Sequence, residues 1–257
     1  MSVALVTGGS RGIGRVIAEN LAKDGYNIAI CYSGNENAAQ ETIEICKKHG
    51  IDGLVVIGGD GSYRGAQALS SLGVNTIGIP GTIDLDIACT DYTIGFDTAV
   101  NTAMQAIDKV RDTSSSHERC SIIEVMGRNA GYIALNVGIS CGAEVILIPE
   151  VKYNLERDVY KVLLEGRNIG KHHYIVVVAE GAGDAVELSR QIESFTEIET
   201  RPTVLGYVQR GGSPTIKDRL TGSLMGIHAI NLLVKGKSGR LIAEQGGAVK
   251  DIDIEKG

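Results

Sequence analysis

The stretch GLVVIGGDGS, residues 53–62, contains the pattern that decides the fold. Its apolar, β-branched half predicts a strand that is buried on both faces, and its glycine-rich half predicts the turn into the next helix. The same alternation of apolar runs and helical patterns recurs along the chain, in VALVT, NIAICY, TIGIPG, SIIEVMG, EVILIPE, YIVVVAEG and TVLGYVQ. We therefore predict an α/β fold with mainly parallel sheets.

The composition indicates a globular chain with a small-molecule ligand. The 257 residues have a formal net charge of −6, only 4% are aromatic, and there is no tryptophan. A nucleic-acid surface would need basic patches and stacking rings, so we expect no nucleic-acid partner. The apolar runs have strand length, far below the roughly 20 residues of a membrane span, and the N-terminus lacks a signal-peptide pattern. We expect a cytoplasmic protein without membrane contact.

Two glycine-rich turns are candidate phosphate sites. In GGDGS, Gly58, Gly59 and Gly61 leave backbone amides free to face phosphate oxygens, and Asp60 offers a hard oxygen ligand to Mg²⁺. An ordinary Asp-Gly turn without a ligand is the alternative. The second turn, TGGSRGIG at residues 7–14, could bind a dinucleotide or could be only a tight connection between strand and helix.

Acidic and basic residues at strand ends are the candidates for chemistry. In TIDLD, residues 82–86, Asp84 and Asp86 lie two positions apart, hence on the same side if the chain stays extended. One carboxylate could accept a hydroxyl proton while the other stays near a metal, although a solvated acidic turn is the alternative. Guanidinium groups at strand ends suit a sugar phosphate, and each could instead form a surface ion pair. We expect one anion site from the set Arg119, Arg128, Arg201 and Arg210.

The first 45 residues resemble the start of the short-chain dehydrogenase/reductase family. The resemblance rests on VTGGSRGIG, residues 6–14, and on the strand end ICYSG, which lacks an acidic residue and would suit NADP(H). Chemistry in that family needs a tyrosine followed by a lysine four positions later, and none of the nine tyrosines has one. An NADP(H)-dependent oxidoreductase and a non-catalytic nucleotide-binding hybrid remain alternative functions.

From about residue 47 onward the chain closely resembles bacterial ATP-dependent 6-phosphofructokinases. The resemblance rests on six motifs in order: GLVVIGGDGS, GIPGTIDLDI, IGFDTAVNT, SSHERCSIIEVMGRNAG, VAEG and TRPTVLGYVQRGGSP. It implies phosphoryl transfer from MgATP to the 1-hydroxyl of fructose 6-phosphate. Together the two resemblances imply a chimera-like chain with its junction near residues 43–47.

The phosphofructokinase resemblance implies roles for individual residues. The catalytic residues would be Asp84, Asp86, Thr82 and Arg128, with Asp84 as the base for the 1-hydroxyl. The nucleotide-binding residues would be Gly8, Gly9, Gly59, Asp60, Gly61 and Ser62, with Asp60 as the Mg²⁺ ligand. The substrate-binding residues would be Arg119, Met126, Gly127, Glu180, Arg201, Tyr207 and Arg210. The effector residues would be Arg111, Glu144 and Lys171.

The resemblance also has implications for assembly, phosphoryl donor and regulation. It implies a homotetramer, because Arg119 and Arg201 would reach the site of a neighbouring subunit. Gly61 and Gly81 match the ATP-using members of the family, so ATP is the expected donor. Leu85 and Tyr207 depart from the pattern, since they stand at an asparagine and a histidine position. The N-terminal arginines of the effector site have no counterpart, so allostery is expected to be weak or absent.

The same resemblance implies two Rossmann-like lobes of three layers each. The nucleotide-binding lobe would comprise residues 1–93 and 213–257, and the sugar-phosphate-binding lobe residues 94–212. The tail VKDIDIEKG, residues 249–257, is expected to be loose.

Overall fold

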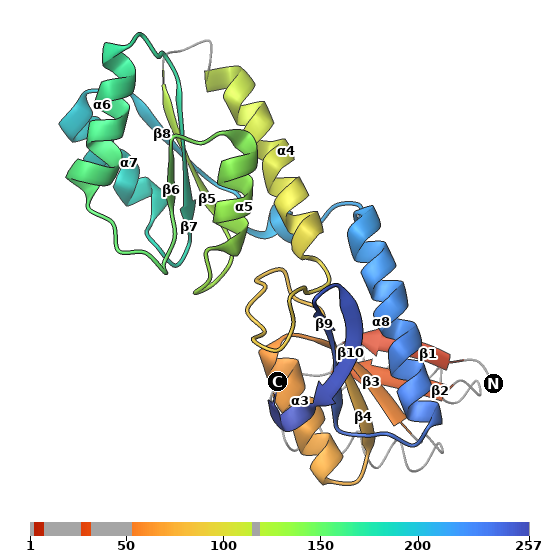
Figure 1. Cartoon of the computed structure of the whole chain (residues 1–257). Helices are drawn as coiled ribbons and strands as arrows, with labels where there is room; N and C mark the ends of the chain where they lie inside the picture. The colour runs from red at the N-terminus through yellow and green to blue at the C-terminus, as the bar shows by residue number, and fades with distance from the viewer. Residues whose placement is uncertain (1–2, 8–26, 32–52, 115–118, 257) are drawn as a thin grey trace. The chain divides into compact units, whose positions relative to one another are not determined.

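The structure is a computed structural model that describes residues 3–7, 27–31, 53–114 and 119–256, with the first two of these ranges described as backbone only. The chain divides into two compact units. The first unit consists of Met1–Thr82, Asp86–Ile94 and Arg219–Gly257, and the second of Ile83–Leu85 and Gly95–Asp218. Each unit is built on its own sheet (Figure 1).

The first unit contains a four-stranded sheet in the order β10-β9-β4-β3. Strands β3 (Gly53–Gly58), β4 (Asn75–Pro80) and β9 (Arg240–Gln245) are parallel, and β10 (Ala248–Asp253) is antiparallel to β9. A separate parallel pair is formed by β1 (Val3–Thr7) and β2 (Asn27–Cys31). Strands β1 to β4 coincide with the apolar runs that predict them, whereas no predicted run covers β9 or β10.

Helices cover both faces of the four-stranded sheet. Successive side chains of a strand point to opposite faces, so both sets of apolar side chains are buried. On one face, Thr76 donates its hydroxyl to the Ala66 carbonyl of α3 (Asp60–Ser71) at 3.2 Å. The other face packs against α8 (Ile216–Val234). The buried residues of that second layer are Val55, Ile77, Ile79, Met225, Ala229, Leu232 and Ile242.

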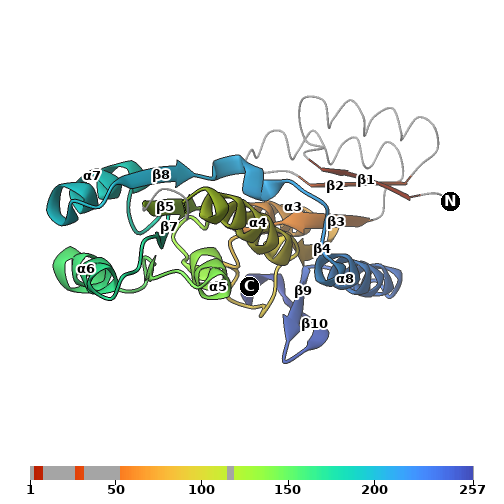
Figure 2. The same ribbon diagram turned by 90° about the horizontal axis from the view of Figure 1, so that it is seen from above.

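The second unit contains a fully parallel sheet in the order β6-β7-β5-β8. Its strands are β5 (Cys120–Val125), β6 (Val145–Leu147), β7 (Tyr174–Ala179) and β8 (Thr200–Val204). Helices α4 (Phe96–Ser114) and α5 (Tyr132–Cys141) lie on one face (Figure 1). The π-helical turn η1 (Glu156–Tyr160), α6 (Lys161–Asn168) and α7 (Ala185–Thr196) lie on the other (Figure 2). All six residues of β7 are buried, as expected for a central parallel strand.

A carboxylate from a distant part of the chain caps helix α4. Asp218 is only 3% exposed and accepts hydrogen bonds from the Gly95 amide at 2.7 Å and the Thr98 amide at 2.9 Å. The Thr98 hydroxyl donates to the same carboxylate. The first amides of a helix have no partner within the helix, so Asp218 satisfies donors that would otherwise be buried unpaired.

The structure confirms the predicted α/β class and its mainly parallel sheets, and it corrects two local expectations. The tail is not loose, because β10 pairs with β9 from Ala248 to Asp253. Gly246 and Gly247 have φ of 60° and 76°, which allows the two-residue turn of a β-hairpin. The run TVLGYVQ is not one strand: β8 ends at Val204, and Gly206–Arg210 forms the 3₁₀ helix η2. Among the described residues, no helix has the length and apolar content of a membrane span.

Candidate functional site

Three parallel strands of the second unit end at one edge of the sheet, where most of the predicted substrate residues gather. Strand β5 leads into residues 126–128, β7 leads into Glu180, and β8 leads into η2. Because the strands are parallel neighbours, these segments meet at their carboxyl ends, the edge where open α/β sheets bind ligands. We call this group, Met126, Gly127, Arg128, Glu180, Tyr207 and Arg210, the carboxyl-edge cluster.

Hydrogen bonds connect the three segments of the carboxyl-edge cluster. The Arg128 amide donates to Glu180 Oε1 at 2.7 Å. The Met126 amide donates to Gln209 Oε1 at 3.2 Å, and Gln209 Nε2 donates to the Gly206 carbonyl at 3.0 Å. Gln209, which is 1% exposed, was not among the predicted site residues. Its position beside Arg210 in the motif VQRGG is the sequence signal that could have found it.

The backbone between Gly127 and Arg128 has an unusual conformation. Gly127 has φ of 143° and Arg128 has φ of 52°, so two consecutive residues lie at positive φ. A Cβ on Gly127 would collide with the Ala130 carbonyl, and one on Gly181 would collide with the Arg128 carbonyl. A non-glycine residue held in the left-handed region costs energy and is concentrated at functional sites. This conformation supports Arg128 as a functional residue.

Tyr207 and Arg210 present aromatic and cationic groups on η2. The Arg210 guanidinium carbon lies 4.9 Å from the centre of the Tyr207 ring, within the range of a cation–π interaction. Tyr207 is 77% exposed, so its hydroxyl is accessible to a ligand. The phenol can donate a hydrogen bond, as the histidine expected at this position could.

Arg119 and Arg201 lie at the opposite, amino-terminal edge of the same sheet. Arg119 comes directly before β5, and Arg201 is the second residue of β8. The six residues of β5 separate the two edges by about 20 Å at the rise of an extended strand. Within one chain the four arginines therefore cannot form one anion site, and the expected site would need Arg119 and Arg201 of a second copy. The four arginines form two groups.

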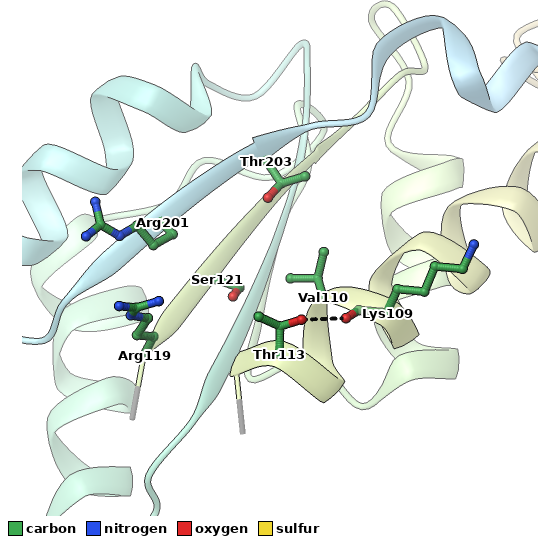
Figure 3. A pocket seen from close by; sticks show the side chains of 7 residues that line it. All are labelled: Lys109, Val110, Thr113, Arg119, Ser121, Arg201 and Thr203. Carbon is green, nitrogen blue, oxygen red and sulfur yellow. Dashed lines mark hydrogen bonds between the residues drawn. The ribbon is translucent and has the colours of Figure 1, made fainter. Parts of the chain in front are cut away.

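A pocket of about 290 Å³ contains the amino-edge arginines. It is lined by Lys109, Val110, Thr113, Arg119, Ser121, Arg201 and Thr203 (Figure 3). Because side chains alternate along a strand, Arg119 and Ser121 share a face with Arg201 and Thr203, and α4 closes that face. We call this pocket the arginine pocket.

The glycine turn of the first unit leads directly into helix α3. Gly59 is extended at the N-cap, and the amides of Ser62 and Tyr63 donate to its carbonyl at 3.0 and 3.1 Å. The Gly81 amide donates to the Gly58 carbonyl at 2.9 Å, which places the backbone of two glycine segments together. A Cβ on Gly58 would collide with Ser62, so the turn depends on glycine there. Gly8 and Gly9 lie outside the described residues.

Asp60, the predicted metal ligand, is the first residue of α3. Its carboxylate is exposed and pairs with Arg64, with 2.7 Å between Arg64 Nη2 and Asp60 Oδ2. Among the residues with described side chains, no group of three His, Cys, Asp or Glu could hold a metal. Mg²⁺ usually takes one or two carboxylates together with substrate phosphates and water. Asp60 therefore fits a Mg²⁺ ion that arrives with a nucleotide, and it does not form a complete protein site.

The segment after β4 carries the predicted catalytic carboxylates, and its backbone is not extended. Leu85, between Asp84 and Asp86, has φ of 54° in the left-handed region. The expectation that the two carboxylates share one side of an extended chain is therefore wrong. The Thr82 carbonyl accepts the Thr93 hydroxyl at 2.7 Å. Thr82 and Asp86 belong to the first unit, whereas Asp84 and Arg128 belong to the second.

The predicted effector residues have structural contacts within the second unit. Arg111, near the end of α4, donates to the Cys141 carbonyl. Lys171 forms an ion pair with Glu144, and the second oxygen of Glu144 accepts the Ile175 amide at 2.5 Å. These contacts join the ends of α4, α5 and β7.

The chain is an α/β protein of the open-sheet class. Its sheets are mainly parallel, helices cover both faces, and polar side chains stand at the strand ends where proteins of this class bind ligands. The family model described as Phosphofructokinase matches residues 15–233. The ATP-dependent 6-phosphofructokinase of Clostridium botulinum is 55% identical over 221 residues, and a second such protein from Clostridium perfringens is 53% identical. These 221 residues are 86% of this chain and 69% of each relative. The chain belongs to the phosphofructokinase family.

Solved structures show the same fold. A phosphofructokinase from Pichia pastoris in the T-state matches 99% of this chain with a TM-score of 0.81 at 25% identity, and this chain spans 35% of its length. A pyrophosphate-dependent phosphofructokinase from Marinobacter aquaeolei matches 99% with a TM-score of 0.78 at 19% identity. The family match begins at residue 15, inside the segment that resembles a reductase. The chimera and the oxidoreductase alternative are therefore not supported.

Proposed function

We propose that this chain transfers a phosphoryl group from MgATP to the 1-hydroxyl of fructose 6-phosphate. The observation that carries the proposal is the carboxyl-edge cluster, in which hydrogen bonds join Met126 and Arg128, after β5, to Gln209, after β8, and to Glu180, after β7. That edge is where open α/β sheets bind small ligands, and an arginine beside a carboxylate suits a phosphorylated sugar. The relatives named ATP-dependent 6-phosphofructokinase support the choice of donor and acceptor.

The catalytic roles follow from the chemistry of phosphoryl transfer. Asp84 would accept the proton of the 1-hydroxyl as its oxygen attacks the γ-phosphorus, with Thr82 and Asp86 as neighbours in the same segment. Arg128 would stabilise the negative charge that develops on the transferred group. When bound, Mg²⁺ would supply positive charge to the nucleotide phosphates, and Asp60 would be its protein ligand.

The two units would bind different parts of the reacting pair. Gly59, Gly61 and Ser62 would face the nucleotide phosphates at the start of α3, and Gly8 and Gly9 remain part of the proposed nucleotide site. Gly61 and Gly81 support ATP as the donor, although Gly81 also has a packing reason, since a Cβ there would lie 2.9 Å from Ile57. The sugar phosphate would contact the carboxyl-edge cluster, namely Met126, Gly127, Glu180, Tyr207 and Arg210.

A second copy of the chain would complete the sugar-phosphate site. The carboxyl-edge cluster and the arginine pocket lie about 20 Å apart along β5, farther than one sugar monophosphate reaches. Arg119 and Arg201 of one subunit would therefore serve the site of a neighbour, in a cytoplasmic homotetramer. Arg111, Glu144 and Lys171 would form the remaining part of an effector site with weak or absent allostery.

The function is tested by ADP release on mixing the protein with fructose 6-phosphate and MgATP. We expect sugar-dependent turnover, and a loss of at least about 100-fold in kcat for Asp84→Asn because the base is removed. Glu165→Gln, which changes an exposed carboxylate paired with Lys161 in the second unit, is the control and should retain parental turnover. A parent protein that releases no ADP in response to the sugar phosphate would refute the proposal.

A further inference from the structure

Glu199 lies beside the two arginines of the arginine pocket because of the register between β5 and β8. Cys120 is paired with Thr200 and Ser121 with Arg201. One position earlier, the Cys120 amide donates to the Glu199 carbonyl at 2.9 Å, which places Glu199 next to Arg119. Glu199 and Arg201 are two residues apart on the same strand edge, so their side chains share a face.

One carboxylate contacts both guanidinium groups. Arg201 donates to Glu199 Oε1 from Nε at 3.0 Å and from Nη2 at 2.5 Å. The Nε of Arg119 lies 2.9 Å from the other oxygen, Oε2. Each guanidinium has five N–H donors, so these contacts engage only part of either group. The remaining donors can bind an anion.

The surroundings of the two arginines resemble an anion site that is ready to bind. Figure 3 shows the guanidinium groups of Arg119 and Arg201 near each other at one end of the pocket, with the hydroxyls of Ser121 and Thr203 on the adjoining strands. The contact from Arg119 Nε to Glu199 is not aligned as a hydrogen bond. Within the described parts of the chain, this buried Nε–H has no hydrogen-bond partner.

The charge state of Glu199 is fixed by its neighbours. The guanidinium groups of Arg119 and Arg201 hold the pKa of its carboxyl below the ordinary value. The carboxylate is therefore ionised at neutral pH. Two guanidinium groups and one carboxylate leave the group with a net positive charge.

We propose that Glu199 is a positioning residue that holds Arg119 and Arg201 together as one binding pair for the phosphate group of the sugar substrate. This inference rests on the proposed function, because it concerns the same substrate. Free arginine side chains have several rotatable bonds, and fixing both before the ligand arrives lowers the entropic cost of binding. Glu199 does not touch the substrate and takes no part in phosphoryl transfer.

A carboxylate also competes with phosphate for guanidinium donors, which would weaken phosphate binding instead of favouring it. The contact pattern favours positioning. Glu199 contacts Arg201 through Nε and one Nη and contacts Arg119 through Nε, so each guanidinium keeps at least one Nη group that Glu199 does not engage. A phosphate can bind these Nη groups while Glu199 stays in place, so removing Glu199 would mainly release two flexible side chains.

The test compares Glu199→Gln and Glu199→Asp with the parent in steady-state kinetics. Glutamine loses the negative charge and replaces one of the two acceptor oxygens by an NH2 group, so it cannot keep both contacts, whereas aspartate keeps the charge and both oxygens. We expect Glu199→Gln to raise KM for fructose 6-phosphate about 10-fold, with kcat and KM for MgATP within about 2-fold of the parent. Glu199→Asp should recover most of the loss, and the control Glu165→Gln should change nothing.

Two kinetic outcomes would overturn the proposal. An unchanged or lower KM for fructose 6-phosphate in Glu199→Gln would show that the carboxylate is neutral or competes with the substrate. A parallel decline of kcat, MgATP affinity and melting temperature would show that Glu199 only supports the fold.

Calorimetric titration separates this proposal from the proposed function. If the parent shows no turnover, the proposed function is rejected. The dissociation constants for fructose 6-phosphate and inorganic phosphate then test whether Glu199 positions the two arginines. Weaker binding of both to Glu199→Gln than to the parent supports a positioning role. Equal binding, or a parent that binds neither compound, overturns it.

Discussion

Leu85 is one of three described non-glycine residues with positive φ, beside Arg128 and Glu197. Its φ of 54° lies in the left-handed region, between the proposed catalytic residues Asp84 and Asp86. That region costs an L-residue about 1–2 kcal/mol, and asparagine tolerates it better than leucine. We expect Leu85→Asn to raise the free energy of unfolding by about 0.5 kcal/mol in urea denaturation, since some of the gain is offset by lost apolar contact.

Leu72 provides the matched control for the asparagine substitution. It is 47% exposed and ends α3 with φ of −90°, a conformation that leucine adopts without strain. Leu72→Asn should therefore not stabilise the protein. If both substitutions lower the free energy of unfolding equally, the left-handed backbone is not what makes Leu85 unfavourable.

The residues that the sequence identified are those that stand within motifs. Met126, Arg128 and Glu180 follow apolar strands directly, so their place at the carboxyl edge could be predicted from pattern alone. Glu199 could not, because its contact with Arg119 depends on the register between β5 and β8. The motif VQRGG marks Gln209, but its hydrogen bond with the Met126 amide could not be predicted, because the two segments follow different strands. The same holds for Asp218, whose partner helix begins more than a hundred residues earlier.

At the level of elements, helix α4 depends on a cap from outside its own sequence. Asp218 accepts from the amides of Gly95 and Thr98 in a buried position. In Asp218→Asn, one of the two acceptor oxygens becomes an NH2 group, which cannot accept the hydrogen bond of a backbone amide. We expect the free energy of unfolding to fall by about 2 kcal/mol, measured by urea denaturation.

Asp184 shows what the same substitution does at an ordinary cap. Its side chain accepts the Glu187 amide at 2.8 Å at the exposed start of α7. Asparagine and aspartate cap helices about equally well, so Asp184→Asn should change the free energy of unfolding by no more than about 0.3 kcal/mol. Similar losses for the two variants would contradict a special role for the buried cap.

Parallel strands were easier to predict than the antiparallel hairpin. The runs of β3 and β7 are apolar throughout, and β5 is interrupted only by Ser121 and Glu124, because both faces of these strands are covered. Such runs stand out in a sequence. Strand β10 mixes Lys250, Asp251 and Asp253 with apolar residues, so it reads as a polar tail. The Gly246-Gly247 turn that precedes it was the available signal for a hairpin.

For the whole molecule, stability in acid depends on carboxylates whose pKa is lower in the folded state than in the unfolded state. Hydrogen bonds from Arg157 and from the Asn154 amide lower the pKa of Asp158 from 3.8 to about 2. A lowered pKa stabilises the fold above the unfolded value, and this contribution is lost as the pH falls toward 2. The lowered pKa of Glu199 acts with the same sign.

The test is the melting temperature of the parent and of Asp158→Asn, measured by calorimetry from neutral pH down to about pH 2. The parent should be the more stable protein near neutral pH, and the difference should shrink as Asp158 becomes protonated. A constant difference across the whole range would mean that this ionisation does not contribute to acid stability.

The class of fold and the family could be predicted from the sequence. The placement of the predicted site residues at two opposite edges of one sheet could not. Motifs give the order of ligand-binding residues along the chain, but not which edge of a sheet each one reaches. Arg128 and Arg119 are nine residues apart and lie on opposite edges, because β5 runs between them. At the N-terminus, the glycine-rich sequence of residues 7–14 resembled another family, since glycine patterns of this kind occur in many α/β proteins.

Three of the outer strands of the two four-stranded sheets, β10, β6 and β8, have a consequence for how the protein behaves at high concentration. An exposed strand edge can pair with another molecule and start aggregation. Strand β10 carries the charged residues Lys250, Asp251 and Asp253, β6 has only three residues, and β8 contains Pro202, which cannot donate a backbone hydrogen bond. Each of these edges is a poor template for further strand addition, which favours solubility in a crowded solution.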